Sequence, residues 1–401
     1  MSDERPRPGL STRAIRAAGR VPQVDQTPTS VPIYQTATFA TDDAAELAAV
    51  SMGERAGYSY SRLGNPTTAA LGAAVAELHG ADAGLAFATG MAAIHGALLS
   101  LLRAGDRILI GTVGYGTTRT QALSAFGRLG IAVDDVDTTD LAAVEAALTA
   151  APTRILHVET VANPTCVVED LPALAALAHA HGAFLTVDNT FASPAVCRPL
   201  EHGADLVMES ATKYLSGHSD VMAGAVAGNT ERMAAVRSAQ VNTGSTLGPF
   251  AAFLVLRGIA TLAVRVERQA RTAAALAAWL QRQGGVSRVT YPFLASHPQH
   301  AVARRILDSG GAMLSFELAA GRVAGPAFID ALEIAERTAS LGSVHTMVVH
   351  PPTTSHRSLS DDQLARAGIT PGLLRVSVGL EDEADLIADF AAGLAAANRA
   401  G

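Results

Sequence analysis

Short apolar runs alternate with segments of helical period between residues 84 and 210, and this alternation constrains the fold more than any other feature of the sequence. Strands joined by helices of roughly 10 to 15 residues form βαβ units, which place the strands parallel to one another. We expect strands at residues 84–88, 107–110, 131–136, 154–159, 184–187 and 204–208, and helices at 91–102, 119–129, 141–149 and 171–181. The chain is therefore predicted to have an α/β fold whose mostly parallel central sheet is flanked by helices.

The pattern changes on both sides of this alternating region. The first 60 residues scatter proline, threonine and glutamine among few apolar periods, as in an extended arm that packs on another surface. Beyond Gly248-Pro249 we expect an alanine-rich helical segment at 251–283, strands near 313–318 and 374–378, and a final helix at 383–398. The length of 401 residues allows more than one domain. We predict an arm at residues 1–60, a large domain at 61–250 and a smaller α+β domain at 251–401.

Composition excludes several classes of partner. The formal charge of −7, from 37 acidic and 30 basic residues, gives no reason to expect nucleic acid. Cys166 and Cys197 are the only cysteines, which excludes a disulfide framework and a zinc site of paired cysteines; buried thiols in a reducing cytoplasm are expected, and no metal site. The N-terminus has no apolar signal segment, and the uncharged stretch 83–102 is interrupted at Thr89-Gly90. We expect a cytoplasmic protein without a membrane partner.

Lys213 is the only lysine among the 30 basic residues. A lysine differs from arginine in that its primary amine can lose a proton and attack a carbonyl, so Lys213 is our candidate nucleophile. The alternative is one solvated lysine left in an arginine-rich chain. The neighbours favour the first interpretation, because Ser210 and Thr212 follow a short apolar run and lie where a buried strand ends. Hydroxyl groups at that position suit a phosphate.

A carboxylate and a turn complete the pattern. Asp188 closes the apolar run 184–187, at the strand end where open α/β sheets bind ligands, and could pair with a cationic ring nitrogen; capping the next helix is its alternative role. Pyridoxal phosphate enzymes need such an acid together with a lysine. Gly90 and Met91 follow a strand and open a helix, where backbone N–H groups bind phosphate, although an ordinary tight turn has the same sequence.

Three further residues are candidates for cofactor or substrate contacts. Tyr115 follows another strand and could stack on a planar cofactor; the absence of a third glycine at Arg119 argues against a dinucleotide-binding fingerprint. Asn163 precedes a proline, which predicts a turn first and a polar contact second. Arg375 lies in an apolar strand, where it requires either a substrate carboxylate or a structural salt bridge.

Seven ordered motifs together resemble the transsulfuration family of pyridoxal phosphate enzymes. This family includes cystathionine γ-synthase, cystathionine γ-lyase, methionine γ-lyase and the homoserine sulfhydrylases, and the resemblance runs from about Tyr34 to the C-terminal helix. The motifs are Tyr60-Ser61-Arg62 with Gly64-Asn65-Pro66-Thr67, Thr89-Gly90-Met91-Ala92-Ala93-Ile94, Tyr115-Gly116-x-Thr118, Val187-Asp188-Asn189-Thr190, Ser210-Ala211-Thr212-Lys213-Tyr214, Ser340-Leu341-Gly342 and Arg375-Val376-Ser377-Val378-Gly379.

The resemblance implies the fold type I architecture of these enzymes and a role for each candidate residue. Lys213 would hold pyridoxal phosphate covalently, and Tyr115 would stack on its ring and help to move protons. Arg375 and Ser340 would receive the carboxylate of an amino-acid substrate. The resemblance further implies that Asp188 pairs with the ring nitrogen, that Asn163 contacts the ring hydroxyl, that Gly90, Met91, Ser210 and Thr212 bind the phosphate, and that Tyr60 and Arg62 reach the phosphate of a neighbouring subunit in a homotetramer.

The implied reaction is chemistry at Cγ, and the sequence leaves its outcome open. Elimination from a sulfur-containing L-amino acid would release a thiol, ammonia and 2-oxobutanoate, whereas replacement would act on an O-acyl-homoserine. Thr117, Thr120 and His345 stand where subgroups of the family carry a cysteine, an arginine and a glutamate, so the chain fits no subgroup fully. A non-catalytic cofactor-binding scaffold is the third possibility, and it is disfavoured because no ionisable group of the expected site is missing.

Overall fold

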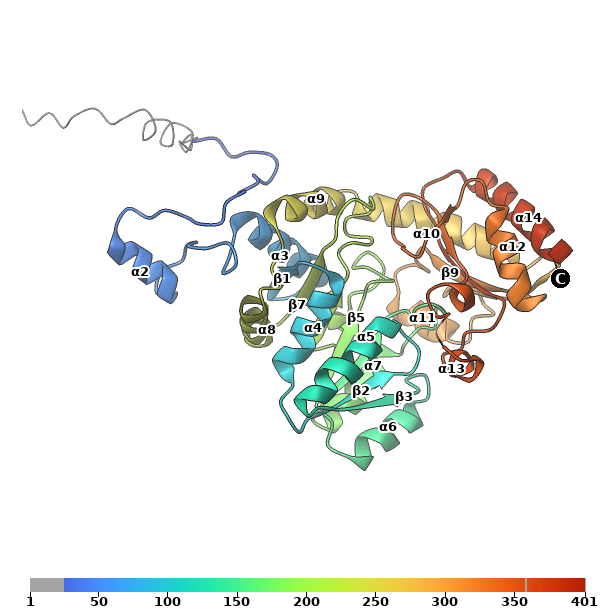
Figure 1. The fold of residues 1–401 in the computed structure, drawn as a ribbon, viewed down its shortest axis with the longest axis horizontal. Coiled ribbons are helices and arrows are strands. Elements are labelled where there is room, and N and C mark those ends of the chain that lie inside the picture. The colour runs from blue at the N-terminus through green and yellow to red at the C-terminus, as the bar shows by residue number, and fades with distance from the viewer. Residues whose placement is uncertain (1–24, 358, 401) are drawn as a thin grey trace, which may run out of the picture. The chain divides into compact units, whose positions relative to one another are not determined.

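A computed structural model of the chain describes residues 25–357 and 359–400 (Figure 1). The chain divides into a short unit, Met1–Pro32, and a main unit, Ile33–Gly401. Residues 25–32 of the short unit carry no helix or strand, and the arginine-rich start of the predicted arm lies outside the described residues.

A seven-stranded sheet forms the centre of the N-terminal two thirds of the main unit (Figure 1). Neighbouring strands lie in the order β1-β7-β6-β5-β4-β2-β3, and only β7 runs antiparallel to its neighbours. This confirms the predicted mostly parallel sheet. The strands are β1 (Ala83–Phe87), β2 (Arg107–Gly111), β3 (Ala132–Val136), β4 (Ile155–Glu159), β5 (Phe184–Asp188), β6 (Leu206–Glu209) and β7 (Gly224–Gly228).

Strand β7 was not predicted from the sequence, and its composition explains why. Four of its five residues are glycine or alanine, which are depleted in strands, and Val226 is the only strong strand former in it. The small side chains are needed because other backbone passes close by: a Cβ on Gly224 would lie 2.1 Å from the carbonyl oxygen of Thr89. A strand of larger residues could not lie beside the turn that begins at Thr89.

Helices cover both faces of this sheet, and the alternation of side chains along each strand supplies one core per face. In β4, for example, Leu156 packs in one core and Ile155 in the other. On the first face lie α3 (Pro66–His79), α6 (Leu141–Ala150), α7 (Leu171–Ala180) and α9 (Pro249–Ile259); on the second lie α4 (Gly90–Leu101), α5 (Gly116–Gln121) and α8 (Thr230–Thr243).

Helix α3 is capped by Asn65, whose side chain accepts the N–H of Thr67. The start of another helix differs from the prediction. The helix expected at 119–129 begins at Gly116 and continues as a π-helical turn, Ala122–Phe126, and a 3₁₀ turn, Gly127–Leu129. The earlier start matters because it makes Tyr115 the residue that precedes the first helical turn. Another helix, α2 (Ala44–Met52), lies within the predicted arm and buries none of its residues in this chain.

A second, five-stranded sheet with its own core occupies the C-terminal third (Figure 1). Its strands lie in the order β10-β11-β12-β9-β8, and helices α12 and α14 pack together through Phe328 and Phe390. The elements are β8 (Val286–Thr290), β9 (Met313–Leu318), β10 (Glu336–Arg337), β11 (Met347–Val349), β12 (Leu373–Ser377), α11 (His300–Ile306), α12 (Ala324–Asp330), α13 (Asp361–Arg366) and α14 (Glu383–Ala400). The domain boundaries after residues 60 and 250 remain predictions.

The expected helical segment at 251–283 is two helices, α9 and α10 (Leu262–Leu280), which meet at an angle of 58°. Near the end of α9 the chain passes close to another loop: a Cβ on Gly258 would lie 2.2 Å from the carbonyl oxygen of Ser216. Among the described residues, no single helix is both long and apolar enough to cross a membrane, and this bent pair meets the criterion only by combined length and composition.

Candidate active site

Lys213 lies in the turn after β6, and its amine is held at the C-terminal edge of the central sheet. Its Nζ donates a hydrogen bond to Oγ of Ser340, 2.7 Å away. Burial, and secondly the positive charge of Arg375, lower the pKa of Lys213 to about 8. The neutral, nucleophilic form of the amine is therefore available at a lower pH than in a solvent-exposed lysine.

Asp188 ends β5, the strand next to β6, and its side chain is buried. One carboxylate oxygen accepts the N–H of Thr190 at 2.9 Å. Burial raises the pKa of Asp188 to about 6, and Glu209 adds to the effect. The bond to Thr190 closes a local turn and caps no helix, so the alternative role as a helix cap is not seen. A cationic ring nitrogen would stabilise the ionised form of this carboxylate.

The first turn of α4 and the Ser210 turn lie against each other. Thr89 caps α4 by accepting the N–H of Ala92 at 3.0 Å, which leaves the N–H groups of Gly90 and Met91 without helical acceptors. A Cβ on Gly90 would lie 2.7 Å from Cβ and 2.8 Å from Oγ of Ser210. Only glycine permits this approach. The two backbone groups, the dipole of a 12-residue helix and the Ser210 hydroxyl form a cradle for an anion.

The hydroxyl of Thr212, which was predicted to bind the phosphate, makes hydrogen bonds to the protein backbone. It donates to the carbonyl oxygen of Ala223 at 3.1 Å and accepts the N–H of Ala223 at 2.9 Å. Its proton is thus already used by the backbone of the segment leading into β7. The backbone N–H of Thr212 donates to the same carbonyl oxygen at 3.1 Å, so both of its donors are used, and its predicted role stays a prediction.

Arg375 in β12 is buried and has no carboxylate partner among the described residues. Its Nη1 donates to Oδ1 of Asn163 at 2.9 Å, and its Nη2 donates to the carbonyl oxygens of Ala339 and Ser340 at 3.2 and 2.9 Å. Its Nε is buried without a partner. The structural salt bridge considered as an alternative is therefore absent from the described part of the chain. The guanidinium instead keeps an uncompensated charge and a free donor, which a substrate carboxylate would satisfy.

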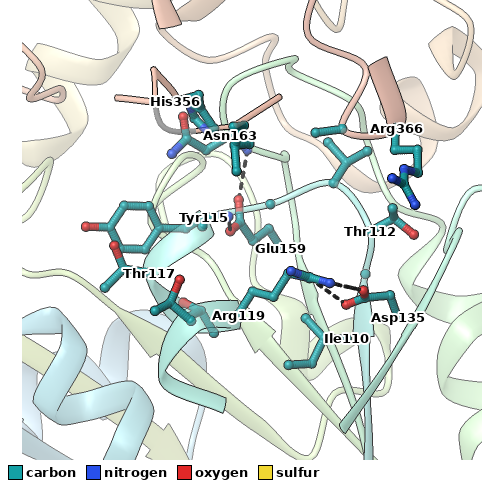
Figure 2. Close-up of a pocket in the computed structure, with 18 of the residues that line it drawn as sticks. Ile110, Thr112, Tyr115, Thr117, Arg119, Asp135, Glu159, Asn163, His356 and Arg366 are labelled. Atoms are coloured by element: carbon teal, nitrogen blue, oxygen red, sulfur yellow. Dashed lines mark hydrogen bonds and ion pairs between the residues drawn. The ribbon is translucent and has the colours of Figure 1, made fainter. Parts of the chain in front are cut away.

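Tyr115 and Asn163 border a cavity of about 400 Å³ (Figure 2). The Tyr115 side chain is 43% exposed, and its backbone N–H donates to the carboxylate of Glu159. Sequence reasoning missed Glu159, although a glutamate that ends an apolar strand was a usable signal. It also missed Phe191, whose ring lies 5.8 Å from the guanidinium carbon of Arg375.

The residues expected to govern distal specificity lie in two places. Thr117 and Thr120 line the cavity beside Tyr115, whereas His345 lines a second cavity, of about 700 Å³, with Ser340 and Thr212. Arg119 does not replace the arginine that relatives carry one position later, because its guanidinium pairs with the carboxylate of Asp135 (Figure 2).

Tyr60 and Arg62 are not joined to these groups by any hydrogen bond within the described residues. The Arg62 guanidinium donates to the carbonyl oxygen of Val241 at 3.0 Å, and its carbon lies 5.9 Å from the centroid of the Tyr60 ring. The Tyr60 side chain is exposed. Their predicted contact with a neighbouring subunit therefore remains a prediction.

Comparison with known proteins identifies the family. The family described as Cys/Met metabolism PLP-dependent enzyme matches residues 11–395. The chain belongs to it. Relatives include L-methionine gamma-lyase of Pseudomonas putida, 44% identical over 391 residues that cover 97% of this chain and 98% of the relative, and O-succinylhomoserine sulfhydrylase of Pseudomonas aeruginosa, 44% identical over 388 residues that cover 96% and 95%. Cystathionine gamma synthase from Xanthomonas oryzae pv. oryzae has a similar structure, with a TM-score of 0.88, 37% identity and coverage of 93% and 94%.

The predicted family, fold and cofactor are thereby confirmed: the protein is an enzyme that uses pyridoxal phosphate (PLP). The described residues fit that group. The Lys213 amine, with its lowered pKa, matches the aldehyde of PLP. The buried Asp188 carboxylate on the adjacent strand matches the ring nitrogen, and the anion cradle at Gly90 and Ser210 matches the phosphate.

Proposed function

We propose that this enzyme cleaves the Cγ–sulfur bond of a sulfur-containing L-amino acid by elimination and releases a thiol, ammonia and 2-oxobutanoate. The proposal rests on the position of the Lys213 amine. Ser340 holds this amine next to Arg375, a buried arginine that has no carboxylate partner among the described residues. Relatives named methionine gamma-lyase, at 40–44% identity over nearly the whole chain, support this reaction.

Arg375 orients the substrate in this account. Its uncompensated charge and free Nε attract the substrate carboxylate, and Ser340 lies beside it. Since Ser340 also accepts the Lys213 amine, binding at Arg375 places the substrate Cα near that amine. In this proposal, Tyr60 and Arg62 reach the cofactor phosphate from a neighbouring subunit.

Lys213 moves the protons. PLP, when bound, supplies an electron sink conjugated with the substrate Cα. The Lys213 amine would take the proton from Cα, pass it to the electron sink, and only then take one from Cβ, so that the leaving group on Cγ can depart. A cationic ring nitrogen would keep Asp188 ionised, and Asp188 would in turn hold that nitrogen protonated. Tyr115 would stack on the ring and assist proton movement near the departing sulfur. Gly90, Met91, Ser210, Thr212 and Asn163 would anchor the cofactor.

A second candidate reaction is γ-replacement on an O-acyl-homoserine. It is favoured by one specific comparison, since an O-succinylhomoserine sulfhydrylase is as similar to this chain, at 44% identity, as a methionine gamma-lyase is. The same residues would serve both reactions until the leaving group departs. The two then differ in whether a thiol or water consumes the unsaturated product.

We further propose a cytoplasmic homotetramer in which two subunits share each active site. Cys166 and Cys197 are buried free thiols, which suits a reducing compartment. Helix α2 buries nothing in its own chain and presents Leu47 and Met52 as exposed apolar side chains, as expected of an element that packs on another subunit. The predicted division at residues 60 and 250 into arm, large domain and small domain belongs to this proposal.

The distinguishing experiment supplies L-methionine or L-cystathionine without any thiol and measures 2-oxobutanoate. Release from either substrate supports elimination. Absence of release from both, together with thiol-dependent turnover of O-succinyl-homoserine by the same cofactor-loaded protein, would replace elimination with the second candidate.

A further inference from the structure

Glu159 places one carboxylate between two parts of the active site that are distant in sequence. It is the last residue of β4 and lies in register with Asp188 on β5. One oxygen accepts the backbone N–H of Tyr115, and the other accepts the backbone N–H of Asn163 at 2.8 Å. Figure 2 shows this carboxylate between the two backbone segments.

The first bond fixes a residue that little else holds. Tyr115 precedes α5 without a side-chain cap, and the residue is 43% exposed. Packing within the chain therefore covers only part of this residue. The backbone N–H of Tyr115 is held instead by a side chain 44 positions away in sequence. A shift of the Glu159 carboxylate would therefore move the whole Tyr115 side chain.

The second bond extends to the substrate-carboxylate side of the site. Asn163, whose N–H is bound by Glu159, accepts a hydrogen bond from Nη1 of Arg375 at 2.9 Å through its own side chain. The chain of contacts thus runs from Tyr115 through Glu159 and Asn163 to Arg375. The Glu159 carboxylate therefore links Tyr115, which is proposed to stack on the cofactor ring, to the part of the site where Arg375 is proposed to bind the substrate carboxylate.

Only a carboxylate meets both contacts. Each partner is an N–H donor, and an ionised glutamate accepts on both oxygens, whereas a glutamine would present its NH₂ group to one of them. Burial and the nearby Asp188 raise the pKa of Glu159, whereas the two N–H groups lower it by favouring the ionised form.

The loop before Tyr115 is shaped to this carboxylate. A Cβ on Gly114 would lie 3.0 Å from Oε1 and 3.4 Å from Cδ of Glu159, which is too close for the present position of the side chain. A Cβ on Gly116, two positions later and the first residue of α5, would meet nothing within 4 Å. The two glycines therefore make a matched pair for an experiment.

We propose that Glu159 is a positioning residue, whose two oxygens set the ring of Tyr115 against the cofactor and the amide of Asn163 against Arg375. The inference rests on the roles proposed for Tyr115 and Arg375. A general contribution to stability is the competing explanation. It predicts a loss of folded protein without any change in the geometry of the cofactor that remains bound.

The test compares Glu159→Gln with Glu169→Gln in the cofactor-loaded enzyme. Glu169 is a suitable control because it is buried, its pKa is also raised by burial, and its side chain accepts a hydrogen bond from Thr138 instead of from the site. Visible circular dichroism of the bound cofactor reports the asymmetry around the ring whatever reaction is catalysed, so a failure of the proposed reaction would not be mistaken for a failure of this inference. We expect Glu159→Gln to change this signal and to raise the substrate KM about tenfold, and Glu169→Gln to change neither. An unaltered signal in Glu159→Gln, or equal losses in both variants, overturns the proposal.

If Glu159→Gln does not fold or bind cofactor, the glycine pair decides. Gly114→Ala should displace the carboxylate and reproduce the altered dichroism and the raised KM, while Gly116→Ala should behave as the wild type. Wild-type behaviour of Gly114→Ala would contradict the positioning role.

Discussion

Nζ of Lys213 and Oγ of Ser340 lie 2.7 Å apart although 127 positions separate the two residues in the sequence. Ser340 also accepts Nη2 of Arg375 on its backbone carbonyl at 2.9 Å. The segment that precedes β11 therefore contacts both the Lys213 amine, at the edge of the seven-stranded sheet, and the Arg375 guanidinium, in the five-stranded sheet. The relationship brings the proton-moving and carboxylate-binding groups to one place.

Loss of the Ser340 hydroxyl should affect turnover more than cofactor binding. In Ser340→Ala the Lys213 amine loses its acceptor, and one hydrogen bond to a charged group corresponds to about a tenfold fall in kcat. Ser343→Ala is the matched control, because the buried Ser343 hydroxyl has no hydrogen-bond partner. Steady-state kinetics with the visible absorbance as a measure of bound cofactor would check this. Equal kcat values in the two variants would argue against the role of Ser340.

Arg375→Met should raise KM about 100-fold, because the substrate carboxylate loses a charge-assisted, forked contact. Arg265 offers a control. It is another buried arginine, on α10, which donates to Thr261 and to the carbonyl oxygen of Gly258, away from the site. Arg265→Met should lower the melting temperature and leave KM unchanged. A KM that is the same in Arg375→Met and the wild type would remove Arg375 from substrate binding.

The position of the central groups followed from the sequence, because Asp188 and Lys213 each come directly after an apolar run. In a parallel sheet such runs end at the same edge, and β5 and β6 are neighbours. The contacts of Glu159 could not be found in this way, since its bond to Tyr115 joins residues 44 positions apart. The approach of Gly258 in α9 to Ser216 likewise joins residues distant in sequence, which no local pattern encodes.

Cofactor capture by the folded apoprotein should depend on pH through Lys213. The nucleophile is the neutral amine, and burial followed by the charge of Arg375 lowers its pKa to about 8. The capture rate should therefore rise with pH and level off above about 8, where a solvent-exposed lysine would still be mostly protonated. In Arg375→Met the plateau should move to higher pH, because one of the two causes is removed. Rapid-mixing absorbance measures both profiles, and a wild-type rate that keeps rising up to the range of an ordinary lysine would contradict the lowered pKa.

Gly90→Ala should weaken PLP binding at least about tenfold, because the added Cβ would overlap Ser210 and open the anion cradle. Gly127→Ala is the control, since a Cβ there meets nothing within 4 Å. Titration of each apoprotein with PLP gives the dissociation constants. Equal affinities would show that the approach of α4 to Ser210 is not required.

Because the chain contains a single lysine, the claim that Lys213 holds the cofactor can be tested by mass alone. Purified enzyme is reduced with borohydride, which fixes a lysine-bound PLP permanently, and the intact mass is measured beside that of Lys213→Ala. The account predicts one pyridoxyl phosphate per wild-type chain and none in the variant. An unmodified wild-type chain after loading with PLP, or the same adduct on Lys213→Ala, would contradict it.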